Sequence, residues 1–236
     1  MDRRWLASFI LILAFAVLGL STALIGPALP DLAYATSSNI KEYTSVFFGR
    51  AIGFLIGVVV SGKIVDRYDQ MVLIGLSIFI CGVVLFTIGL LKSIWQVAAA
   101  ISSIGFAMGI LDTAGNVFVL QLWNRKGEES TQSSVLQAVH AGFAIGGMLC
   151  APLARPFLGE YDVGGQDIAT LNSKDDVDII SVEDWQVISE GRLDVLFPIV
   201  GAIVVLISIL FFIEFKFSKR SFKTQNNRPG NHNKIF

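Results

Sequence analysis

Apolar residues run along this chain in long stretches that short polar segments separate. A helix that crosses the hydrocarbon core of a bilayer needs about 20 mostly apolar residues. The pattern therefore predicts an all-α integral membrane protein in which residues 1–215 form one six-helix transmembrane bundle. The predicted transmembrane helices are residues 5–32, 43–65, 71–91, 95–123, 132–157 and 193–215.

The composition agrees with this class, because 53% of the residues are hydrophobic and only 16% are charged. Little chain remains for a soluble domain. The first apolar stretch is longer than the roughly 7–15 residues of a signal-peptide core, so we expect it to stay uncleaved as a helix. The chain is then a multi-pass protein, expected in the plasma membrane with its N-terminus in the cytoplasm.

Lysine and arginine are distributed unevenly between the two sides of the predicted bundle. With the N-terminus inside, most of them fall on the cytoplasmic side, as the positive-inside rule requires, and both termini are then cytoplasmic. The loop at 158–192 is acidic and non-cytoplasmic, and we interpret it as a solvated spacer, with cation attraction as the alternative. The tail at 216–236 is basic and rich in Asn, which predicts a disordered segment next to membrane lipid and no nucleic-acid partner.

Asp112 is the most informative residue, because a charge deep in hydrocarbon costs several kcal/mol or more and therefore marks a candidate functional site. Asn116 lies one helical turn further on, while Gln137 and His140 share a face of the next predicted helix. The short loop at 124–131 predicts that these two helices are antiparallel neighbours. We therefore predict a substrate- and ion-binding site near the membrane midplane. Polar contacts between helices are the alternative role for Asn116 and Gln137, and a satisfied interior imidazole is the alternative for His140.

Arg50 is a second buried charge, on the outer half of the second predicted helix. Pairing with Asp31, at the end of the first predicted helix, would reduce the cost of its burial. We favour a structural pair, and an outer gate is the alternative. The same helix carries small residues at every fourth position, which predicts close helix packing, either static or sliding. These residues are Gly49, Gly53, Gly57 and Ser61.

The loop after the second predicted helix carries Gly62, Ile64, Asp66 and Arg67. It resembles the G-x-L-x-D-R-x-G-R-[RK] motif of the major facilitator superfamily, which lies between helices two and three. The resemblance implies that Gly62, Asp66 and Arg67 take part in gating and conformational change. Asp69 stands where the motif has its second Gly, and the basic pair that ends the motif is missing.

The segment Leu111-Asp112-Thr113-Ala114-Gly115-Asn116 resembles the L-E-T-A-A-N segment of fucose–proton symporters, with Asp in place of Glu. The stretch at 136–140 is similar to their A-Q-T-F-N segment, and His140 replaces the Asn. Residues 26–31, 48–54 and 140–156 resemble the sodium-dependent glucose transporter branch of the superfamily. The resemblance implies symport of a hexose such as glucose, coupled to Na⁺ or H⁺, with no cofactor and no metal site.

An enzyme is another class of function to consider. Tyr68-Asp69 and Gly109-x-x-Asp112 superficially match motifs of intramembrane aspartyl proteases, which need two carboxylates close enough to share a proton. One of these aspartates is expected in a loop and the other inside the membrane. The G-x-S-x-G, H-E-x-x-H and Walker motifs are absent from the sequence. We therefore predict that the chain is not an enzyme.

The length of 236 residues fits one half of a major facilitator superfamily transporter, which is built of two six-helix halves. The predicted function is thus ion-coupled sugar transport by a truncated or partial carrier that pairs with a second half or with another copy of itself. The alternative is a non-transporting membrane protein that pairs with or modulates a full-length carrier.

Overall fold

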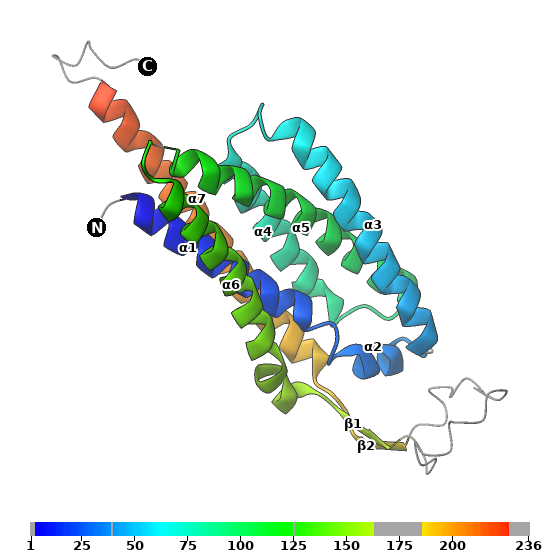
Figure 1. Ribbon diagram of the computed structural model, residues 1–236. Helices are drawn as coiled ribbons and strands as arrows, with labels where there is room; N and C mark the ends of the chain where they lie inside the picture. The colour runs from blue at the N-terminus through cyan, green and yellow to red at the C-terminus, as the bar shows by residue number, and fades with distance from the viewer. Residues whose placement is uncertain (1–2, 39, 125, 163–185, 227–236) are drawn as a thin grey trace.

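The computed structural model describes residues 3–38, 40–124, 126–162 and 186–226, and Figure 1 shows its arrangement. These residues form a bundle of α-helices with one 3₁₀ turn and one small antiparallel hairpin. The helices are α1 (Arg3–Ala23), α2 (Leu29–Ala35), α3 (Ile40–Ile64), α4 (Gln70–Ile88), α5 (Ile94–Leu122), α6 (Glu129–Ala154) and α7 (Leu193–Asn226). The 3₁₀ turn is η1 (Arg155–Phe157), and the strands are β1 (Glu160–Asp162) and β2 (Gln186–Ser189).

Six helices of the described part are long and apolar enough to cross a membrane, which confirms the predicted number. They are α1, α3, α4, α5, α6 and α7, each of which covers most of one predicted stretch. The prediction of an all-α integral membrane protein is therefore confirmed. The bundle has a continuous buried apolar core to which all six of these helices contribute.

The first predicted helix, residues 5–32, was too long. The structure ends α1 at Ala23, turns through residues 24–28, and begins the separate short helix α2 at Leu29. Pro27 lies in the turn, and Pro30 lies in the first turn of α2, where a missing backbone N–H breaks no helical hydrogen bond. The apolar composition continues through both helices, and for this reason a pattern of hydropathy alone joins them.

The last helix extends further than predicted, because α7 continues to Asn226 instead of ending at residue 215. The first part of the basic tail is therefore helical and not disordered as expected. The sequence from Glu214 to Asn226 contains neither Gly nor Pro, and the next helix breaker is Pro229. Residues 227–236 lie outside the described part of the chain, as do residues 163–185 of the acidic loop.

The helices pack in pairs. The most extensive contacts join α3 to α5, α1 to α6, and α4 to both α5 and α7. In Figure 1, α1 and α6 accordingly run side by side, and α3 lies along α5. By contrast, α5 and α6 make few direct contacts. The prediction that α5 and α6 are packed neighbours was wrong, because a short loop fixes only where two helices are joined.

Glycines explain which helices pack against each other. A Cβ atom added to Gly53 or Gly57 of α3 would overlap backbone oxygens of α5, and one added to Gly105 or Gly109 of α5 would overlap backbone oxygens of α3. The strip predicted on the second transmembrane helix therefore lies directly on a matching strip of α5. Such close approach of backbones replaces side-chain packing inside a membrane.

The contact between α1 and α6 is built in the same way. A Cβ atom on Gly19 of α1 would overlap the carbonyl oxygen of Phe143, and one on Gly146 of α6 would overlap the carbonyl oxygen of Ala16. Two helix pairs, α1 with α6 and α3 with α5, are thus joined backbone to backbone, and the space between the pairs remains available for a cavity.

Candidate functional site

A cavity of about 240 Å³ lies between the two helix pairs. Its wall is mostly apolar, with aromatic rings from three helices. Two groups that can ionise interrupt this wall, the carboxylate of Asp112 and the imidazole of His140. The cavity is lined by Phe15 and Leu18 of α1, Phe54 of α3, Met108 and Asp112 of α5, and His140 and Phe143 of α6.

The structure brings Asp112 and His140 to the same cavity, although α5 and α6 do not pack closely there. Asp112 is partly buried and His140 is exposed. The ring of Phe15 stands edge-on to the imidazole, with the ring centroids 6.1 Å apart and the planes at 87°. Helix α1 therefore contacts His140 through Phe15, and the opening between α5 and α6 leaves room for a solute next to both polar groups.

The other two predicted site residues do not line this cavity. Asn116 lies one turn along α5 from Asp112, and its buried Oδ1 accepts no hydrogen bond from the described residues. Gln137 is exposed on α6, and its Nε2 lies 3.4 Å from the hydroxyl oxygen of Ser133 in the same helix. Binding of substrate by Asn116 and Gln137 stays a prediction.

The aromatic lining was missed by sequence reasoning. Phe15, Phe54 and Phe143 each lie within a long apolar stretch, where a ring facing a cavity has the same hydropathy as a ring facing lipid. The periodic glycines were the one feature of the sequence that could have indicated these rings. Phe54 comes directly after Gly53, and Phe143 directly after Gly142, so both rings flank faces that contact another helix.

The last turn of α3 and the loop between α3 and α4 carry the residues of the predicted motif. Asp66 and Arg67 are exposed in the loop, and a Cβ atom added to Gly62 at the end of α3 would meet no atom within 4 Å. Asp69, the main departure from the motif, forms the N-cap of α4, with its Oδ1 accepting a hydrogen bond of 3.1 Å from the backbone N–H of Met71. The departure thus has a local structural role, while gating by Gly62, Asp66 and Arg67 stays a prediction.

Asp31 and Arg50 lie near the other end of the bundle. Asp31 is only 3% exposed, and its carboxylate accepts a hydrogen bond of 3.0 Å from the backbone N–H of Gly159. A Cβ atom on Gly191 would overlap the same carboxylate, so both ends of the β1–β2 segment lie close to Asp31 of α2. The side-chain stem of Arg50 lies against Gly105 of α5.

The structural pair of Asp31 with Arg50 stays a prediction. The carboxylate of Asp31 faces glycine backbone, because the absence of a side chain at Gly159 lets its backbone N–H reach the carboxylate. Gating by the pair in another conformation stays a prediction.

Comparison with known proteins assigns the chain to a family. The family model described as Major Facilitator Superfamily matches residues 11–232. The chain belongs to this superfamily. The family resemblance predicted from the loop motif is therefore confirmed, and the protein is an integral, multi-pass member of a transporter family.

Its relatives include proteins named "Sodium-dependent glucose transporter 1". The human protein is 33% identical over 220 residues, which cover 91% of this chain and 41% of the relative. The rat protein is 38% identical over 152 residues, covering 64% of this chain and 30% of the relative. "Major facilitator superfamily domain-containing protein 4A" of Xenopus tropicalis is 27% identical over 200 residues, covering 84% and 39%. The chain thus spans less than half the length of these relatives.

A solved structure has the same fold. It is the crystal structure of a bacterial homolog to the human lysosomal transporter Spinster, in an inward-facing and unoccupied conformation. The TM-score is 0.65 at 14% sequence identity, and the match covers 91% of this chain and 43% of that chain. At this identity the likeness supports the six-helix fold alone.

Proposed function

We propose that this bundle is the solute- and ion-binding half of a secondary sugar carrier. The observation that carries the proposal is that Asp112 and His140 face one cavity inside the membrane-spanning part of the bundle. The names of the relatives support a hexose such as glucose as the solute and a cation as the coupling partner.

The residues around the cavity suit this task chemically. A carboxylate accepts hydrogen bonds from hydroxyl groups, and an imidazole both donates and accepts them. The rings of Phe15, Phe54 and Phe143 offer apolar surface to the C–H faces of a sugar. The carboxylate of Asp112 is the proposed coupling group, since it can neutralise Na⁺ or take up a proton.

A second bundle is the proposed partner, because part of the cavity wall belongs to the two least buried spans. Only 17% of the α3 span and 28% of the α6 span are buried, against 50% for α4. Phe54 of α3 and His140 of α6 both line the cavity. A second six-helix half, or another copy of this chain, would cover these faces and supply the missing wall, and rocking of the two halves would give alternating access.

The first experiment measures uptake by residues 1–236 alone. In cells that lack hexose carriers, we expect no saturable uptake of glucose, fucose or urea, with or without Na⁺, because the cavity has no opposing wall. Co-expression with the second half of the human relative is expected to restore glucose uptake. An Asp112→Asn chain is the control, and saturable uptake above this control by the chain alone would contradict the need for a partner.

A non-transporting protein that pairs with a full-length carrier is the second candidate, and the open faces of α3 and α6 favour it equally. The two candidates differ in one result. A modulator changes the uptake rate of a co-expressed full-length carrier, and this change survives Asp112→Asn. A carrier half no longer contributes to sugar uptake when Asp112 is replaced.

The proposed orientation places both termini in the cytoplasm of a cell whose plasma membrane holds the protein. In a background with Cys81 and Cys150 replaced by Ala, we expect Asn172→Cys to react with a membrane-impermeant thiol reagent added outside, and Lys126→Cys to react only after permeabilisation. Permeabilised cells provide the labelling control. The reverse pattern would contradict the orientation.

A further inference from the structure

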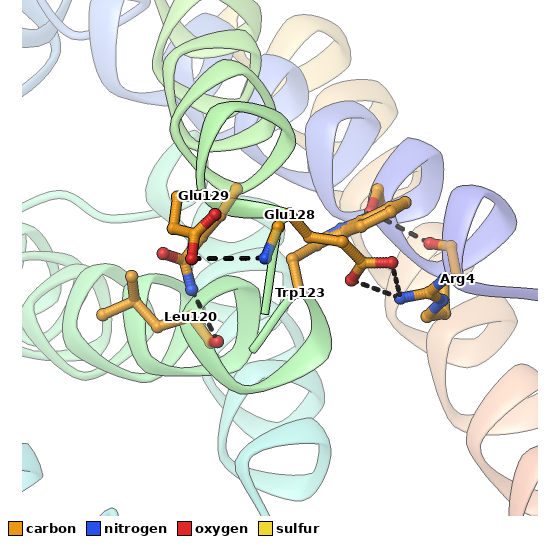
Figure 2. A network of polar contacts seen from close by, with 8 residues as sticks. Arg4, Leu120, Trp123, Glu128 and Glu129 are labelled. Atoms are coloured by element: carbon orange, nitrogen blue, oxygen red, sulfur yellow. Dashed lines mark hydrogen bonds and ion pairs between the residues drawn. The ribbon is translucent and has the colours of Figure 1, made fainter. Parts of the chain in front are cut away.

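Three helices that line the cavity also meet at one end of the bundle, in a polar cluster that the proposed function does not use. Figure 2 shows the cluster, which we call the α1–α5–α6 clasp. Arg4 Nη1 of α1 donates to both carboxylate oxygens of Glu128, at 2.7 and 3.0 Å. The indole Nε1 of Trp123, at the end of α5, donates to the hydroxyl of Ser8 at 3.1 Å.

Aromatic contacts complete the α1–α5–α6 clasp. The guanidinium carbon of Arg4 lies 4.6 Å from the centroid of the Trp123 ring, so the cation sits over the π-face. Trp5 packs edge-on against the same ring, with centroids 4.8 Å apart. Trp123 thus contacts three residues of the first helix, Arg4, Trp5 and Ser8, and all of these contacts converge on one indole.

Burial makes these contacts stronger than ordinary surface pairs. Trp123 is 4% exposed and Ser8 is 2% exposed. The side chains of Arg4 and Glu128 are 20% and 25% exposed. Exposed ion pairs are weakened by solvent and by side-chain entropy, whereas a partly buried charge pair with two hydrogen bonds is held in a fixed geometry.

The α1–α5–α6 clasp joins parts of the fold that otherwise contact each other little. Helix α6 packs on α1, and helix α5 packs on α3 and α4, while direct contact between α1 and α5 and between α5 and α6 is sparse. A hydrogen bond of 2.8 Å from Gln132 Nε2 to the carbonyl oxygen of Leu120 also ties α6 to α5, but it does not include α1. The clasp therefore holds the α1–α6 pair against the end of α5.

Geometry connects this end of the bundle to the cavity. At 1.5 Å per residue, His140 lies about 18 Å along α6 from Glu128, and Asp112 lies about 16 Å along α5 from Trp123. A tilt of about 10° between the two helices at the clasp would move the imidazole about 3 Å relative to the carboxylate over this length. A shift of that size exceeds the tolerance of a hydrogen-bonded site.

We propose that Arg4, Trp123 and Glu128 are positioning residues that set the distance between Asp112 and His140 across the cavity. The contacts fix the angle at which the α1–α6 pair meets α5, and the helices transmit this angle to the cavity. The proposal concerns the geometry of the bundle alone, so it stands or falls independently of which solute is bound.

The test measures a distance in the whole chain, reconstituted in lipid nanodiscs. Spin labels are attached at Ser103→Cys on α5 and Ala144→Cys on α6, two exposed positions beyond the cavity from the clasp, with Cys81 and Cys150 replaced by Ala. We expect a narrow distance distribution for the parent chain. Arg4→Ala and Glu128→Ala are each expected to shift the mean by about 4 Å, because Ala144 lies about 24 Å along α6 from Glu128, or to broaden the distribution by as much.

The matched control is Arg155→Ala, which removes an exposed arginine from the other end of α6 and is expected to leave the distribution unchanged. The charge swap of Arg4→Glu with Glu128→Arg restores the ion pair but not the cation over the Trp123 ring, so it is expected to return the distribution part of the way toward that of the parent chain, which loss of general stability would not explain. If the Ala variants do not fold, Glu128→Gln and Trp123→Phe each remove part of the clasp more mildly. Unchanged distances in folded clasp variants, or no recovery on charge swap, would overturn the proposal.

Discussion

Replacing Asp112 by Asn is expected to abolish concentrative sugar uptake by a carrier completed with a second half. Asn keeps the size of the side chain and its place in the cavity, but it can neither take up a proton nor neutralise Na⁺. The accumulation ratio in proteoliposomes with an imposed Na⁺ or H⁺ gradient should fall to about one, while sugar exchange without a gradient persists, because an uncoupled carrier only equilibrates its solute.

The matched control for this experiment is Asp194→Asn, the same chemical change at an exposed position of α7. It is expected to leave the accumulation ratio unchanged. Concentrative uptake that survives Asp112→Asn would remove Asp112 from the coupling step. Loss of folded protein in that variant alone would assign the carboxylate a structural role instead.

Replacing Gly146 by Ala is expected to be among the most damaging single changes to the fold. The added methyl group would overlap the backbone oxygen of Ala16, which no change of side-chain rotamer can relieve, so α1 and α6 must separate. Overpacking costs typically 1–3 kcal/mol, and we expect about 3 kcal/mol because the obstacle is backbone. Thermal unfolding of the purified chain in detergent, followed by circular dichroism, measures the loss.

The next residue provides the control. A Cβ atom on Gly147 meets its nearest neighbours at 3.8 Å, which is ordinary contact. Gly147→Ala is therefore expected to be neutral or to stabilise the helix by up to about 1 kcal/mol, through the higher helix propensity of Ala. Equal stabilities of the two variants would show that the α1–α6 backbone contact is looser than described.

The sequence was sufficient to predict the six spans, because the cost of placing polar groups in hydrocarbon demands long apolar stretches. The same cost makes Asp112 a candidate functional residue, and its role stays a prediction. The sequence was insufficient to predict where each helix ends and which helices pack against each other. The break after Ala23 was missed because apolar residues continue on both sides of it. The pairing of α5 with α3 was missed because loop length records only chain connection, while the matching of glycine strips on two different helices decides which helices pack.

The candidate site could be predicted only in part, because helical spacing does not show what each helix face meets in the folded bundle. Helical spacing places residues on a common face, and it correctly placed Asp112 on α5 and His140 on α6 toward one region. Whether a given face meets a cavity, a neighbouring helix or lipid depends on tertiary packing, which left Asn116 and Gln137 outside the cavity lining. The aromatic residues of the lining had no distinguishing signal, because hydrocarbon and cavity accept the same rings.

In the helix pair α1–α6, the close contact is made by glycines and backbone atoms, whereas the cavity is lined by side chains. Ala16, Gly19 and Gly146 make the backbone contact between the two helices, while Phe15, Leu18 and His140 line the cavity. A substitution at a lining position therefore changes the shape or polarity of the cavity without touching the surface that holds the pair together. For the proposed carrier half, solute preference can therefore be changed at the lining positions while the scaffold persists, which makes these positions suitable targets for engineering selectivity.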